Sequence, residues 1–196
     1  MTTAASSMIV VTGVDGVLRC AQTGSCRDAL EALRWLATYD VPVVMTARGP
    51  AADIVRFQAE VGLRHPFIAD GGAALFVPQH YFAPMRVRGV QLSGWERIDI
   101  TAGAGDIRPA LELLLSFYRA ASDGDLLVVG CAGNRHDAAV LELADVQVVV
   151  RPSPLPTTQD DDADHELLLR SWPSAYLTTA SGPQGWSEAI LGGVAA

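Results

Sequence analysis

Five short apolar runs, each rich in Val, Ile and Leu, constrain the fold of this chain more than any other feature. They lie at residues 8–12, 41–46, 66–69, 125–130 and 146–150. The runs are continuous rather than alternating, which is typical of strands buried on both faces of a parallel sheet. Helical patterns separate them, so we expect right-handed crossovers from strand to strand. The sequence therefore predicts an α/β fold, a three-layer αβα sandwich around a mainly parallel sheet.

The helical signals are apolar residues at helical spacing, preceded by residues that favour a helix start. Pro50 precedes one such pattern, and Asp106 is a candidate N-cap for another. We expect helices over residues 26–39, 51–61 and 107–120, after Gly133, and over 183–191.

The length of 196 residues suits one core with a small insertion. Residues 71–101 break the strand and helix rhythm with scattered Gly, Pro and aromatic residues. We expect residues 1–76 and 102–196 to form the core and residues 77–101 a small insertion, with possible strands near 86–92 and 97–100. The Pro-rich and acidic residues 152–164 are expected to form a solvated loop.

Charge and composition exclude several functional classes. The chain has 14 basic residues, all Arg, against 22 acidic ones, and its net charge of -8 argues against a nucleic-acid partner. It has no run of about 18 apolar residues, so we expect neither a membrane span nor an export signal. Three cysteines without a CxxC pair favour a reducing, cytoplasmic setting over a disulfide framework or a zinc site.

Polar and glycine-rich residues follow four of the five apolar runs. Ligands of open parallel sheets bind beyond the carboxyl ends of the strands, so we expect these four segments to converge on one cleft. The segments are residues 12–16, 46–48, 70–72 and 130–137.

Each candidate residue in these segments has two interpretations, and both stay open. Asp15 is either an acid/base group or a residue that bonds the turn at Gly16. Thr46, followed by Ala47 and Arg48, binds phosphate or caps the next helix. Asn134 and Arg135 offer backbone N–H groups and a guanidinium to an anion, or simply begin a helix.

Two further residues of the fourth segment are left open in the same way. Asp137, with His136 beside it, is a candidate metal or acid/base group, or a solvated residue at a helix start. Cys131 follows a buried strand beside a helix start, where its thiol is either activated or a small buried apolar group.

These segments resemble the motifs of the haloacid dehalogenase superfamily of phosphatases, most of all its mannosyl-3-phosphoglycerate phosphatase branch. TGVDGVL at residues 12–18 matches the family's T-D-x-D-G-T-L in frame, and Thr46 falls on its second motif. PFIADGGAALF at residues 66–76 and AGNRHDAAVL at residues 132–141 resemble two further motifs, and residues 182–189 resemble the tail of that branch. The resemblance implies a Rossmannoid, mainly parallel sheet, a phosphatase mechanism with Mg²⁺, and a cap that would here be reduced to residues 77–101.

The chain departs from the family at three catalytic positions. Gly13 stands where the family has its nucleophilic Asp, and Gly133, or Cys131 in the other register, stands where it has a metal-binding carboxylate. Ile107 occupies the position of the family's Lys, with Arg108 as the nearest cation. The surviving metal donors would be Asp15 and Asp137, so we expect weak Mg²⁺ binding or none.

Two functional hypotheses follow from these matches and departures. The first is a pseudoenzyme that binds a small phosphorylated metabolite or a protein partner with Thr46, Ala47, Arg48, Asn134 and Arg135. The second is a Mg²⁺-dependent sugar-phosphate phosphomonoesterase with an atypical site that relies on Asp15, Thr46 and Asp137. Aromatic residues of the insertion also suggest a possible homodimer contact, namely Tyr81, Phe82 and Trp95.

Overall fold

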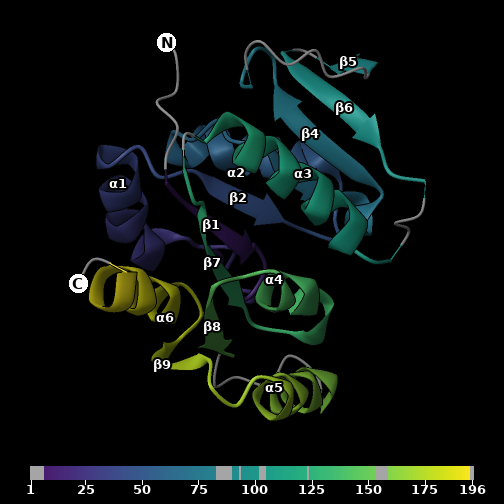
Figure 1. The fold of residues 1–196 in the computed structure, drawn as a ribbon. Helices are drawn as coiled ribbons and strands as arrows, with labels where there is room; N and C mark the ends of the chain where they lie inside the picture. Colours follow the sequence, from purple (N-terminus) through teal and green to yellow (C-terminus); the bar gives the residue numbers. More distant parts are fainter. Residues whose placement is uncertain are drawn as a thin grey trace.

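Nine strands in the described part of the chain form one sheet, with β1 near its centre (Figure 1). The computed structural model describes residues 7–82, 90–92, 94–101, 105–122, 124–152 and 159–194. The strand order is β5-β6-β4-β3-β2-β1-β7-β8-β9. The strands are β1 (Met8–Gly13), β2 (Val43–Thr46), β3 (Phe67–Ala69), β4 (Ala74–Pro78), β5 (Val90–Leu92), β6 (Trp95–Asp99), β7 (Leu127–Ala132), β8 (Val146–Arg151) and β9 (Tyr176–Ser181).

The sheet is mainly parallel, as the continuous apolar runs predict. Strands β3, β2, β1, β7, β8 and β9 run parallel to one another, and each of the five predicted runs supplies one strand among them. Strands β4, β6 and β5 continue the sheet in antiparallel pairs. The prediction of an α/β sandwich with a mainly parallel sheet is therefore confirmed.

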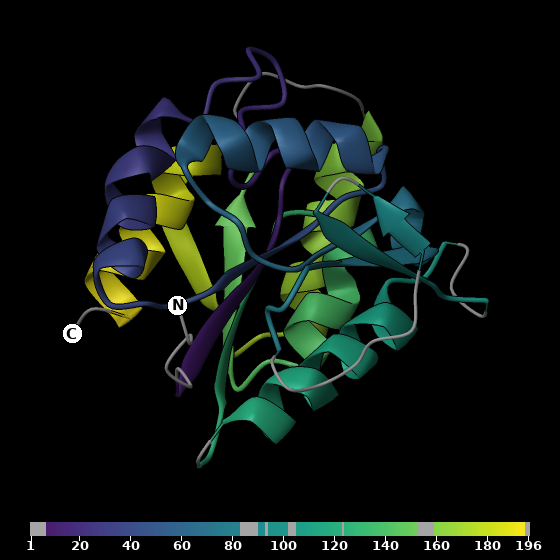
Figure 2. The ribbon, with the colours of Figure 1, turned by 90° about the horizontal axis from the view of Figure 1, so that it is seen from above.

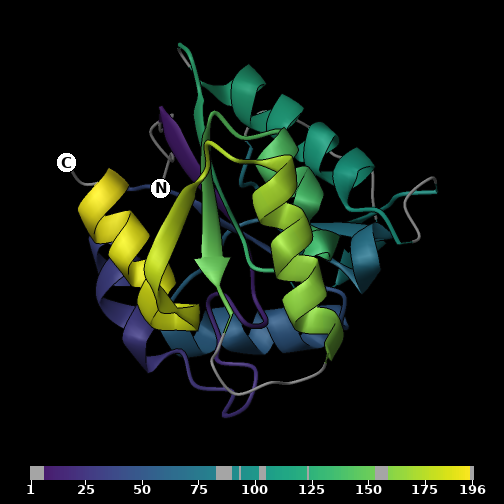
Figure 3. The ribbon, with the colours of Figure 1, turned by 90° about the horizontal axis from the view of Figure 1, so that it is seen from below.

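Helices cover both faces of this sheet. The helices are α1 (Leu30–Thr38), α2 (Ala51–Val61), α3 (Arg108–Ala121), α4 (Ala138–Glu142), α5 (Gln159–Ser171) and α6 (Gly182–Ala189). Along β1, Val10 packs in the apolar cluster with α1, α2 and α6, whereas Ile9 and Val11 pack in the cluster with α3 and α4. Figure 2 shows α1 and α6 on one side of the strands and α3 on the other. Figure 3 shows α5 on the opposite side of β8 and β9 from α6.

Four strands lie outside the five apolar runs: β5 and β6 fall near the strands expected at 86–92 and 97–100, whereas β4 and β9 were not predicted. Strand β4 folds back on β3 after a tight turn in which Asp70, Gly71 and Gly72 all have positive φ. Strand β9 is polar in sequence and forms one edge of the described sheet. Strand β4 is apolar and buried along its whole length, but it pairs antiparallel with β3 directly after the turn, without an intervening helix. Strand β9 lacks a continuous apolar run because it lies at the edge of the sheet.

The segment predicted as an insertion contributes the antiparallel end of the sheet. Strand β6 pairs with β4, and the Trp95 ring packs edge-on against Phe67 with 5.0 Å between ring centroids. The rings of Tyr81 and Phe82 also pack edge to face, and Phe82 is buried. Residues 83–89 and 93 lie outside the described residues, and the division into a core and a reduced cap stays a prediction.

The acidic segment differs from the prediction. Residues 152–164 were expected to form a loop, but α5 begins at Gln159, so the expectation is wrong for residues 159–164. Acidic residues are favourable in the first turn of a helix, because the helix dipole presents partial positive charge there. In the part of the chain that the structure describes, no helix is both long enough and apolar enough to span a bilayer.

Candidate functional site

The carboxyl ends of β1, β2 and β7 lie side by side. Gly13 is in register with Thr46 on β2, and Thr12 is in register with Cys131 on β7. The turn that follows β7 carries Asn134 and Asp137 back toward these ends. Three of the four segments singled out in the sequence are thereby brought together around one point.

That point is the carboxyl group of Asp137. Its Oδ1 atom accepts a hydrogen bond from Thr46 Oγ1 at 3.1 Å, and its Oδ2 atom accepts one from Asn134 Nδ2 at 3.2 Å. The Asn134 side chain also caps the turn, because its Oδ1 atom accepts a bond from the backbone N–H of His136 at 2.9 Å. Asp137 is therefore held in one position from two sides.

Burial dominates the electrostatics of Asp137. The residue is 8% exposed, and burial raises the pKa of its carboxyl from 3.8 to about 6. The hydrogen bonds from Thr46 and Asn134 and the positive charge of Arg48 favour the ionised form, yet they offset only part of that effect. The carboxyl is thus a weak acid that titrates near neutrality.

Gly13 and Asp137 share one small volume. A Cβ atom built on Gly13 would overlap Oδ2 of Asp137 and would lie 3.1 Å from its Cγ. The Asp137 carboxyl therefore fills the space that any side chain at position 13 needs. A carboxylate is present at the end of β1, but it comes from the turn after β7.

Asp15 makes no hydrogen bond to Asp137 among the described residues, although its negative charge raises the pKa of that carboxyl. Its side chain is 60% exposed, and its Oδ1 atom accepts hydrogen bonds from Nη2 and Nε of Arg19 at 2.6 and 3.1 Å. Arg19 is a site residue that the sequence pattern did not indicate: it lies four residues after Asp15, but the segment is a tight turn with Gly16 at positive φ rather than a helix. The charge of Asp15 is therefore balanced at the surface by Arg19.

The segment after β2 contains one cation that faces the cluster. Arg48 is exposed, its charge acts on Asp137, and within the described ranges its guanidinium has no hydrogen-bond or ion-pair partner. Ala47 donates its backbone N–H to Ile68 at 3.0 Å, so that N–H is already used within the fold. Arg135 is exposed at the start of the turn Arg135–Asp137.

Comparisons with known proteins find phosphatases by sequence and haloacid dehalogenase-like folds by structure. No family model matches the chain. A glucosyl-3-phosphoglycerate/mannosyl-3-phosphoglycerate phosphatase of Persephonella marina is 26% identical over 121 residues, which are 62% of this chain and 45% of that protein. A protein of the same name from Methanococcoides burtonii is 31% identical over 75 residues, which are 38% of this chain and 28% of that protein. The chain therefore spans less than half the length of these two curated relatives.

Solved structures share the fold over nearly the whole chain. The sucrose-phosphatase of Synechocystis sp. PCC6803 superposes with a TM-score of 0.57 at 13% identity, covering 97% of this chain and 98% of that one. A haloacid dehalogenase-like hydrolase of Bacillus subtilis, yhjK, gives 0.57 at 11% identity over 97% of this chain and 89% of that one. The fold is haloacid dehalogenase-like. At low identity, the sequence also resembles the two curated phosphatases.

The residues of this haloacid dehalogenase-like chain do not fit the Mg²⁺ that the family implies. One solved neighbour, a phosphatase of Haemophilus influenzae with a TM-score of 0.51, is a cobalt-bound form. Here Asp137 is buried, and both of its carboxyl oxygens accept hydrogen bonds, from Thr46 and from Asn134. The carboxylate of Asp15 is paired with Arg19. Among the described residues, no group of three or more His, Cys, Asp or Glu side chains could hold a metal ion. Mg²⁺ needs a near-octahedral set of oxygen ligands, and one enclosed carboxyl does not provide it.

The other two departures from the family are also explained by packing. Ile107 is 6% exposed in the apolar cluster beneath α3, and Arg108 is paired with Glu142 and lies 3.9 Å from Glu112. A Cβ atom at Gly133 would lie 3.0 Å from Cγ2 of Val17, so a larger residue there must push its neighbour aside. Neither position supplies a charge to the cluster.

Cys131 behaves as a buried apolar residue. Its side chain is fully buried, and burial raises the pKa of the thiol to about 12, although the neighbouring Trp186 indole acts in the opposite direction. At neutral pH the thiol is therefore not a nucleophile. This geometry favours the second of the two interpretations of Cys131.

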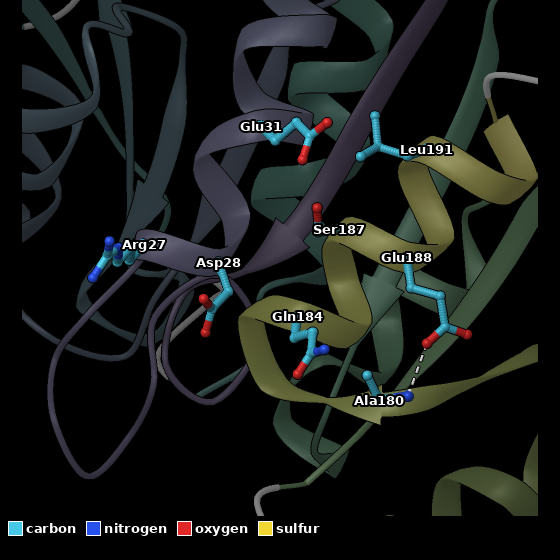
Figure 4. Close-up of a pocket in the computed structure, with 8 residues that line it drawn as sticks. All are labelled: Arg27, Asp28, Glu31, Ala180, Gln184, Ser187, Glu188 and Leu191. Carbon is cyan, nitrogen blue, oxygen red and sulfur yellow. Dashed lines mark hydrogen bonds between the residues drawn. The ribbon is translucent and has the colours of Figure 1, made fainter.

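A separate cavity lies between residues 27–31 and α6 (Figure 4). None of the candidate residues at the strand ends lines it. Its Glu188 carboxylate accepts hydrogen bonds from the backbone N–H groups of Ala180 and Thr179 and from the hydroxyl of Tyr176, and these bonds lower its pKa to about 2. Glu188 thereby satisfies the backbone at the end of β9, which is a structural role.

Proposed function

We propose that this chain is a phosphatase-like protein without phosphatase chemistry that binds a phosphorylated metabolite at the ends of β1, β2 and β7. The observation that carries the proposal is the Asp137 carboxyl in the space of a side chain at Gly13. The position of the family's nucleophile has no reactive group, and a side chain there would have to displace the Asp137 carboxyl. Loss of a catalytic nucleophile lowers turnover by about 10⁴ to 10⁶.

An anionic ligand is favoured by Arg48. Its side chain is exposed, its charge acts on Asp137, and it has no ion-pair partner in the described part of the chain. A guanidinium in that state binds phosphate or carboxylate groups with charge-assisted hydrogen bonds. The names of the curated relatives, which are phosphatases of sugar phosphoglycerates, favour a phosphorylated metabolite over a protein partner.

A second candidate function is supported by Asp137 itself. A carboxyl with a pKa of about 6 suits general acid/base catalysis near neutral pH, as a phosphomonoesterase with an atypical site would need. That activity would depend on Mg²⁺ in this family, and the donor set does not fit the ion. We therefore rank it second.

One experiment separates the two functions. The purified chain is assayed for phosphate release from a panel of sugar phosphates and phosphoglycerates, with and without Mg²⁺, and its thermal unfolding is followed with each compound. We expect no turnover above background and a rise in Tm with one of the compounds. Ligand at 100 times its Kd stabilises a protein by about 2.7 kcal/mol.

Two matched variants test whether a ligand-induced rise in Tm comes from binding at the ends of β1, β2 and β7. Arg48→Gln should abolish the rise in Tm, whereas Arg170→Gln, a change on the exposed surface of α5, should leave it intact. Turnover that disappears in Asp137→Asn would establish the phosphomonoesterase instead. The absence of both turnover and stabilisation would reject a metabolite as the ligand.

A further inference from the structure

Two of the three cysteines flank an exposed loop that leaves the end of β1. Cys20 and Cys26 bracket residues 21–25, which are all exposed. The backbone N–H of Cys20 donates to the carbonyl of Ser25 at 2.9 Å, and the N–H of Gly24 donates to the carbonyl of Cys20 at 2.8 Å. These bonds close the neck of the loop, so the backbone of Cys20 lies against the residue that precedes Cys26.

The two thiols differ in a way that suits a redox pair. Cys20 Sγ donates to Gln22 Oε1 at 3.1 Å, and the thiol pKa is lowered below 9.0 by the Thr23 hydroxyl first and then by backbone N–H groups of the same turn. Both residues are partly exposed, but Cys26 also packs against the apolar cluster that includes α1, and burial raises its thiol pKa. The thiol that ionises more readily attacks a disulfide first, and a second thiol nearby resolves the product.

The third cysteine cannot take part in the folded chain. Cys131 is fully buried on β7, with a thiol that is not ionised at neutral pH. Cys20 and Cys26 are therefore the two cysteines that can pair, and the buried thiol of Cys131 stays reduced.

We propose that Cys20 and Cys26 form a reversible disulfide when the chain meets a low-molecular-weight disulfide such as oxidised glutathione. The Cys20 thiolate attacks one glutathione sulfur, the glutathione disulfide bond breaks, and one glutathione thiolate leaves. The Cys26 thiolate then attacks Cys20 Sγ in the mixed disulfide and releases the second glutathione thiolate. The two protons lost by the protein thiols are taken up by the two leaving thiolates, so the protein is oxidised by two electrons and the glutathione disulfide is reduced.

A Cys20–Cys26 disulfide would constrain the loop that connects the Asp15–Arg19 pair to the cavity beside α6. Arg19, which precedes Cys20, holds Asp15, and Arg27 and Asp28, which follow Cys26, line the cavity beside α6. The loop is the dark purple segment at the foot of Figure 3. The inference does not depend on the proposed function, because it rests on the loop alone.

Thiol counting and mass spectrometry test the proposal. The reduced, full-length chain is incubated with oxidised glutathione at neutral pH, denatured, and titrated with Ellman's reagent. We expect the three thiols to fall to one, the mass to fall by two hydrogen atoms with no glutathione retained, and a peptide that joins Cys20 to Cys26. Dithiothreitol should restore all three thiols.

Serine variants separate this pair from general oxidation. Cys26→Ser should stop at a mixed disulfide on Cys20, Cys20→Ser should react much more slowly, and Cys131→Ser should still form the intramolecular bridge. The proposal is overturned by a wild-type chain that keeps all three thiols. It is equally overturned by a stable glutathione adduct on the wild type, by a bridge that includes Cys131, or by a bridge that joins two chains.

Discussion

Replacing Asp137 by Asn tests the electrostatics of the candidate site. Asn has nearly the same shape as Asp and can keep a hydrogen bond with Thr46, but it does not ionise. The folded protein raises the pKa of Asp137 from 3.8 to about 6, chiefly by burial. Each unit of pKa shift corresponds to about 1.4 kcal/mol, so ionised Asp137 costs the folded state about 3 kcal/mol.

The sign of the pH dependence follows from that shift. Between pH 4 and pH 6 the folded chain binds the Asp137 proton more tightly than the unfolded chain does, so this group makes stability fall as pH rises. Above about pH 6 its effect is constant. We therefore expect Asp137→Asn to be more stable than the wild type by up to about 3 kcal/mol at pH 7.5, with a difference that shrinks toward zero near pH 4.

Urea unfolding of both proteins, followed by circular dichroism from pH 4 to pH 8, measures this difference. His65 titrates in the same window with the opposite sign, because burial lowers its pKa to about 4, and stability from its neutral form is lost as pH falls below 6.5. His65 is present in both proteins, so its effect cancels in the difference. A difference that does not change with pH, or a less stable variant at pH 7.5, would refute the dominant role of burial at Asp137.

Three further substitutions test the packing around the sheet. Gly13→Asp should lower the free energy of unfolding by about 3 kcal/mol, because the new side chain overlaps Asp137 and adds a second buried carboxyl. Titration calorimetry of this variant should detect no new Mg²⁺ binding. A gain in Mg²⁺ binding would show that the Asp137 carboxyl can move out of its place. Glu188→Ala should cost about 1 to 3 kcal/mol and speed amide hydrogen exchange at Thr179 and Ala180, whose N–H groups it leaves without this partner; unchanged exchange would contradict the role of Glu188. Leu114→Ala, at a fully buried position of α3, should cost about 2 to 5 kcal/mol in urea unfolding, against little for the exposed Arg119→Ala.

Much of the fold could be read from local patterns. Helix α2 runs over the predicted residues 51–61, and the continuous apolar runs locate five of the parallel strands to within two residues at each end. The patterns are informative because a strand buried on both faces must be apolar along its whole length. Strand β9 lacks that requirement at the edge of the sheet, and the start of α5 lies among acidic residues that also suit a loop.

The sequence by itself determined which chemical groups stand at the ends of the strands. A glycine at position 13 has no nucleophile in any conformation, and Thr46, Arg48, Asn134 and Asp137 follow buried strands. Only the tertiary structure decided what these groups do to one another. In the folded chain, the Asp137 carboxyl lies where a side chain at Gly13 would be, and Asp15 pairs with Arg19. The charge of Arg48 acts on the buried Asp137 carboxyl. Such contacts depend on side-chain packing between segments far apart in the chain, and no local spacing encodes them.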